Sequence, residues 1–217
     1  MALESLEREQ GLVFAVEYRR RAFFLRPNWN VEGYLDSLGL PYDATRAEVA
    51  AKSMRRHDAI KRLYAEAGLS PDYERAHGPG SGFADTMDSH RLAWYAATVG
   101  KGEECWAELS RRYFEGKPGP IVLGNHRQLL EVAEVVGLDV AAAARVLESG
   151  EFKEEVKADM REMQQLGIEG IPVMIFDVLS NGRGDPLRGA LPSVRHDGSG
   201  KVADYVAILE GLHHATV

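Results

Sequence analysis

The spacing of apolar positions changes several times along the 217-residue chain. Near the N-terminus, Leu3 and Leu6 fall on one helical face ahead of Gly11, which predicts a short helix. The next segment, Leu12–Leu25, begins and ends with apolar runs and contains β-branched residues, so it predicts a strand.

The middle of the chain repeats apolar residues at helical spacing. The predicted helices cover approximately residues 45–67, 85–99, 102–115, 125–136, 139–147 and 151–166. Thr45 with Glu48 forms a capping-box pattern, and Asn125 and Asp139 are typical N-cap residues. This stretch is too long for a single crossover connection, so it indicates an all-helical insert.

The spacing of apolar residues changes again at Gly167. Ile171–Val178 is a short apolar run that predicts a strand, and a second short strand is expected near Leu187–Ala190. Val202–Leu212 has the apolar spacing of a final amphipathic helix. The order of elements is therefore helix, strand, six helices, two strands and helix, which predicts an α/β fold with a helical insert.

Charge and cysteine content narrow the function classes. The chain has 26 Lys+Arg against 33 Asp+Glu, and a net charge of −7 argues against a nucleic-acid or anionic-membrane partner. No apolar run approaches the ~20 residues that cross a bilayer, and the first residues lack a secretory pattern. We therefore expect a cytoplasmic protein, or an organellar one if residues precede Met1.

Cys105 is the single cysteine. With one cysteine, an internal disulfide, a Cys-based zinc site and a two-cysteine redox motif are all excluded within these 217 residues. Because free cysteines usually behave as small buried apolar residues, we expect Cys105 to be a core residue. No other cluster has metal-ligand spacing, so we expect no metal site.

Four regions of the sequence resemble the DsbA-like branch of the thioredoxin-fold proteins, in particular its FrnE-type members. They are Gly167–Phe176, Phe23–Gly33, Asp88–Trp94 and, in two pieces, Tyr113–Gly116 with Leu129–Asp139. The resemblance implies one DsbA-like domain over 1–213. Residues 1–40 and 167–213 would form its thioredoxin-like part and 45–166 its all-helical insert.

The resemblance also implies a function, thiol–disulfide exchange with protein thiols or disulfides, which would make the chain an oxidoreductase. In this family a cis-proline loop holds the backbone of the substrate, and the matching residues here are Ile171 and Pro172. His90, at the start of its helix, is predicted to face the cleft and bind substrate; simple packing is the alternative.

The sequence departs from the family at its N-terminus, where the family's first strand and its Cys-x-x-Cys motif have no counterpart. No catalytic residue is therefore assigned within this chain. The absent strand would lie centrally in the sheet, so we expect either marginal stability or a homodimer that covers the vacant position.

Two other functions stay open. A redox-inactive relative would use the edge at Pro172 to bind an extended peptide or glutathione. A relative of the glutathione-dependent transferases and isomerases would use glutathione as a substrate. Apart from glutathione, no cofactor is expected.

Overall fold

The chain divides into two compact units, which are described separately. The computed structural model describes residues 2–12, 14–24, 85–117, 119, 121–179, 193–198 and 200–215, with isolated positions between 39 and 68. We call Met1–Leu25 together with Arg161–Val217 the terminal unit, and Arg26–Met160 the helical unit.

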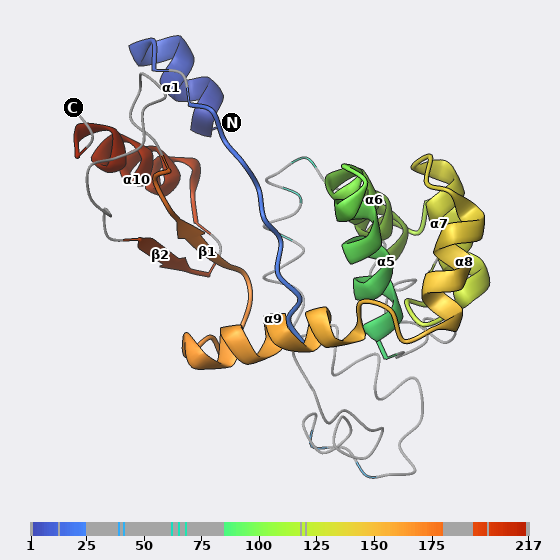
Figure 1. Cartoon of the computed structure of the whole chain (residues 1–217). Helices are drawn as coiled ribbons and strands as arrows, with labels where there is room; N and C mark the ends of the chain where they lie inside the picture. Colours follow the sequence, from blue (N-terminus) through green and yellow to red (C-terminus); the bar gives the residue numbers. More distant parts are fainter. Residues whose placement is uncertain are drawn as a thin grey trace. The chain divides into compact units, whose positions relative to one another are not determined.

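Helices make up most of the helical unit where the structure describes it (Figure 1). They are α5 (Met87–Thr98), α6 (Gly102–Ser110), α7 (His126–Val135), α8 (Val140–Glu148) and the first part of α9 (Lys153–Gln165). Helix α6 continues into a π-helical turn, η1 (Arg111–Glu115), that ends at Gly116 with φ +64°. Helix α5 packs against α6, and α7 packs against α8. The predicted helices in this region are confirmed.

The N-termini of these helices show why the sequence predicts them well. The side chain of Asn125 accepts a hydrogen bond from the amide of Gln128 at 3.2 Å. Asp139 accepts from the amides of Ala141 and Ala142 at 2.9 and 3.1 Å. Each cap satisfies amides that have no partner within their own helix, so the helix start is encoded by one residue.

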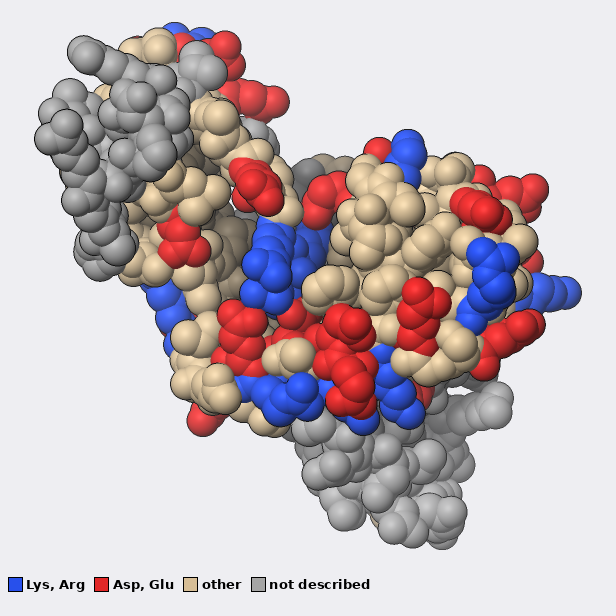
Figure 2. All heavy atoms as spheres, in the orientation of Figure 1, with Lys and Arg blue, Asp and Glu red and all other residues tan. Residues whose placement is uncertain are grey.

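Apolar side chains from α5 to α8 form one buried core in the helical unit. Its buried members are Leu92, Ala93, Ala96, Cys105, Leu109, Ile121, Leu129, Val132, Ala133, Leu138, Ala143 and Leu147. Cys105 lies among them, as expected from the sequence. The surface around this core is charged: Figure 2 shows acidic and basic side chains interspersed over the face in view.

The terminal unit combines two helices with a small sheet. Helix α1 (Ala2–Gln10) packs against α10 (Val202–His214) (Figure 1). Strand β1 (Val173–Phe176) pairs antiparallel with β2 (Val194–Asp197), so that Val173 lies opposite Asp197 and Phe176 opposite Val194. Phe176 contacts Tyr205 of α10, with ring centroids 6.4 Å apart, and this contact joins the sheet to the helix.

One predicted element is wrong. The described residues of Leu12–Leu25 form neither strand nor helix and run as an extended segment after α1. An extended segment becomes a strand only when a neighbouring backbone pairs with it, and the described part of the terminal unit places no such neighbour there. The helix predicted over 45–67, apart from isolated positions, and the strand predicted near Leu187–Ala190 lie outside the described residues.

We expect Leu129→Ala to lower the free energy of unfolding of the helical unit by about 2–5 kcal/mol, because it leaves a cavity in the core. Leu129 is 0% exposed, whereas Val135 on the same helix is 59% exposed. Val135→Ala is therefore the matched control and should change the free energy by less than about 1 kcal/mol. Urea unfolding followed by the fluorescence of Trp94 and Trp106 measures both; equal effects would contradict the assigned core.

Candidate substrate-binding site

The loop between α9 and β1 begins at a well-defined helix end. Gly167 has φ +64°, a conformation that favours glycine, and its amide bonds to the carbonyl of Gln164 at 3.0 Å. The amide of Ile168 reaches back to the carbonyl of Met163 at 2.9 Å, and the Ile168 side chain is buried. These contacts are typical of a Schellman helix end, which turns the chain sharply toward β1.

The Ile171–Pro172 peptide bond at the other end of this loop is cis. The carbonyl of Pro172 accepts a hydrogen bond from the amide of Gly198 at 2.8 Å, just beyond β2. Ile171 is 55% exposed, and among the described residues neither its amide nor its carbonyl makes a hydrogen bond. The backbone of Ile171 is thus an available donor and acceptor next to a residue that has no amide hydrogen of its own.

Strand β1 follows directly after this loop. It pairs with β2 on one side, and no described strand pairs with its other side. Met174 and Ile175 in the strand and Leu179 beyond it are exposed apolar residues. The loop and the strand together form an edge with backbone hydrogen-bonding groups and apolar side chains, which suits an extended polypeptide.

His90 lies in the helical unit, on α5, and only 9% of the residue is exposed. Its ring is 5.4 Å from that of Trp106, measured between centroids. Burial lowers the pKa of His90 to about 4, against the opposing effect of the carboxylates of Asp159 and Asp85. The imidazole is therefore neutral at pH 7. Its predicted binding of substrate stays a prediction, since Ile171 and Pro172 belong to the other unit.

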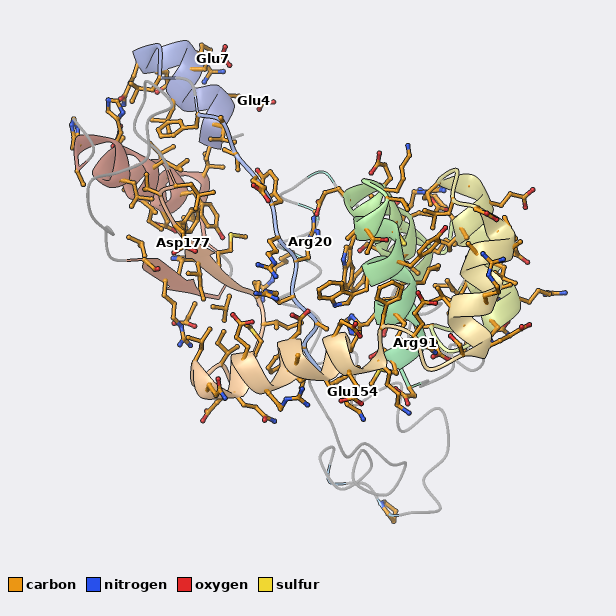
Figure 3. The ribbon with its side chains drawn as sticks, in the orientation of Figure 1. Glu4, Glu7, Arg20, Arg91, Glu154 and Asp177 are labelled. Atoms are coloured by element: carbon orange, nitrogen blue, oxygen red, sulfur yellow. The ribbon has the colours of Figure 1, made fainter. Side chains whose placement is uncertain are left out.

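The residue after His90 explains much of the sequence motif around it. Arg91 is buried and donates hydrogen bonds to the carbonyls of Val146, Ser149 (2.6 Å) and Glu151 (2.7 Å) (Figure 3). Its guanidinium also pairs with Asp88 at 2.7 Å. The carbonyls of Val146 and Ser149 lie at the C-terminal end of α8, where a helix leaves carbonyls without partners of its own, and that of Glu151 lies in the connection to α9. Arg91 therefore holds the end of α8 against α5.

The single thiol is poorly suited to exchange chemistry. Cys105 is fully buried, and burial raises the pKa of its thiol to about 12, assisted by the nearby Glu108 carboxylate. Disulfide exchange requires a thiolate, which this environment disfavours.

Within the part of the chain that the structure describes, no group of three His, Cys, Asp or Glu side chains could hold a metal ion. No described helix is both long and apolar enough to cross a bilayer.

We expect Cys105 to react with Ellman's reagent at pH 8 at least about a hundredfold more slowly in the native chain than in the unfolded chain, because both access and thiolate formation are suppressed. The double variant C105A/S110C carries one thiol on an exposed position of the same helix and should react quickly. Similar native rates for the two single-thiol proteins would contradict the buried position.

The buried His90 should make stability fall as the pH falls. Because its folded pKa is near 4 and an unfolded histidine titrates near 6.5, only the unfolded chain gains a proton between these values. The free energy of unfolding should therefore decrease between pH 6.5 and pH 4, by up to about 3 kcal/mol from this residue. His90→Leu should reduce the fall in the free energy of unfolding between pH 6.5 and pH 5, where carboxylates stay ionised. The free energies are measured by urea unfolding at each pH. The same pH dependence in the variant and the unaltered chain would refute the assignment.

Comparison with known proteins identifies the family and the fold of the chain. The family model described as DSBA-like thioredoxin domain matches residues 1–191. A search of curated proteins finds no match. Among solved structures, a probable DsbA oxidoreductase from Streptomyces coelicolor matches with a TM-score of 0.65 and 21% identity, covering 97% of this chain and 79% of the other.

The structural match shows the fold, and the family model extends over most of the chain. The predicted α/β class, a thioredoxin-like fold with a helical insert, is confirmed by these matches. The chain belongs to the family of DSBA-like thioredoxin domains.

Proposed function

We propose that this chain is the substrate-holding part of a thiol–disulfide oxidoreductase and binds an extended polypeptide along Ile171, Pro172 and the open side of β1. The observation that carries the proposal is the exposed backbone of Ile171, whose amide and carbonyl have no hydrogen bond among the described residues. An extended peptide would supply both partners by adding a strand to this edge.

Apolar exposure along the same edge supports a polypeptide over a small charged ligand. Ile171, Met174 and Ile175 follow one another along the loop and strand, and each is exposed. Met174 and Ile175 are consecutive in β1 and so lie on opposite faces of the sheet, and side chains in an added strand alternate in the same way, so a bound peptide would find an apolar group on each face of this edge. Backbone bonds would set the affinity, and apolar contacts would set the preference for protein segments that are normally buried.

The exchange chemistry itself needs two thiols, one to attack and one to resolve the mixed disulfide. Cys105 supplies neither, because it is buried and its thiol pKa is raised. In this proposal the reactive thiols come from outside these 217 residues. The second candidate is a redox-inactive module that binds peptides or glutathione, and the burial of the single cysteine favours it.

The peptide proposal is tested with one ten-residue cysteine-free peptide in three forms. The first form is unmodified, the second is N-methylated at the odd positions, and the third is N-methylated at the even positions. In a paired strand, only alternate amides face the neighbouring backbone. We expect one pattern to weaken binding to the chain about tenfold or more and the other to change it much less, measured by fluorescence anisotropy. Equal weakening by both patterns, or no binding of the unmodified peptide, would contradict the proposal.

Two variants locate the binding site. Ile171→Asp should weaken the unmodified peptide, while Val135→Asp, an equally exposed apolar position in the helical unit, should leave its affinity unchanged. An insulin-reduction assay separates the two candidate functions. If the chain is part of an oxidoreductase, it should accelerate the reduction of insulin once a reactive thiol pair is supplied in the same polypeptide. If it is a redox-inactive binding module, the rate of insulin reduction should not change. Calorimetry with glutathione shows whether the tripeptide binds at this site or only longer chains do.

A further inference from the structure

One end of the loop that presents Ile171 is attached to the short strand β2, and the other end to Gly198, the residue directly after it. At the start of the loop, Arg195 of β2 donates hydrogen bonds to the carbonyls of Leu166 (2.6 Å) and Gly167 (3.4 Å). At its end, the amide of Gly198 bonds to the carbonyl of Pro172 at 2.8 Å. The loop from Ile168 to Ile171 is therefore an arc whose two ends are held by residues only three positions apart, Arg195 in β2 and Gly198 directly after it.

The guanidinium of Arg195 is itself held in place. Asp197 lies two residues further along β2, so its side chain is on the same face as that of Arg195. Its carboxylate accepts from Nε at 2.9 and 3.0 Å and lies 2.8 Å from Nη2. A planar guanidinium can bind a carboxylate along one side and two carbonyls with its remaining donors, whereas a lysine ammonium has no such fork.

These contacts lie directly beyond the C-terminus of helix α9, at the carbonyls of the two residues that follow Gln165. The C-terminal carbonyls of a helix have no partners within the helix, and a basic side chain near them satisfies both hydrogen bonding and the helix dipole. Arg195 therefore joins the end of α9 to the strand that leads directly into Gly198, the partner of Pro172. The position of the loop then depends on β2 and not on the loop sequence alone.

We propose that Arg195 is a positioning residue that fixes the backbone of Ile171 for binding of the extended polypeptide. This inference rests on the proposed function. A loop held in its binding geometry loses less conformational freedom when the ligand arrives, so affinity is gained without a direct contact between the residue and the ligand. Asp197 acts through Arg195 by orienting the guanidinium.

The test compares R195K and D197N with R8K, a control that makes the same substitution at an exposed arginine of the terminal unit. Three quantities are measured for each: the dissociation constant for the unmodified ten-residue peptide, amide hydrogen exchange at Gly167 and Ile168, and the free energy of unfolding. We expect R195K to raise the dissociation constant about fivefold or more and to speed exchange at these two amides. D197N should change both in the same direction by less, and R8K should change neither.

Several outcomes would overturn this role. Unchanged peptide affinity and unchanged exchange in R195K would show that Arg195 does not position the loop. If amide hydrogen exchange rises equally in β1, β2 and α10, and the free energy of unfolding also falls, Arg195 has a general structural role. If the unaltered chain binds no peptide, the proposed function fails and the role of Arg195 in binding fails with it; local exchange in R195K still shows separately whether Arg195 holds the loop.

Discussion

The terminal unit depends on one short ladder, the four-residue antiparallel pairing of β1 with β2. A two-stranded pair of this length is only marginally stable by itself, so side chains that connect it to neighbouring helices contribute strongly to its geometry. Phe176 packs against Tyr205 at one end, and Arg195 connects β2 to the end of α9. Because β1 begins directly after Pro172, any shift in the ladder moves the backbone of Ile171.

The helical unit shows how much of a fold local sequence can determine. Helices α7 and α8 begin at Asn125 and Asp139, because a single side chain satisfies the first amides of each helix. Apolar spacing then identifies the buried face, since residues such as Leu129 recur at helical intervals. Both signals lie within a few residues of the element that they predict, and for that reason these predictions are confirmed.

The predictions fail where structure depends on distant residues. Leu12–Leu25 has the composition of a strand, but composition does not provide the neighbouring backbone that a strand requires. The Ile171–Pro172 loop could be identified from its sequence, whereas the role of Arg195 could not. Arg195 is 29 residues from Leu166 in sequence, and its position in a short polar strand gives no signal of the contact.

The motif around His90 combines three different roles in consecutive residues. His90 is a buried neutral imidazole beside Trp106, Arg91 satisfies carbonyls at the end of α8, and Leu92 lies in the core. All three roles can be explained by packing within the helical unit. A motif that identifies a family therefore need not mark its chemistry, because the same residues would be required to hold these helices together.

Binding a polypeptide and exchanging its disulfides place opposite demands on a protein. Binding requires exposed backbone groups with apolar surroundings, which the loop at Ile171 provides. Exchange requires an accessible thiol with a low pKa, and Cys105 is buried with its pKa raised to about 12. The two proposed functions therefore depend on different parts of the protein. The proposed peptide binding at the β1 edge can be tested without redox chemistry, and a thiol pair can then be added to test exchange.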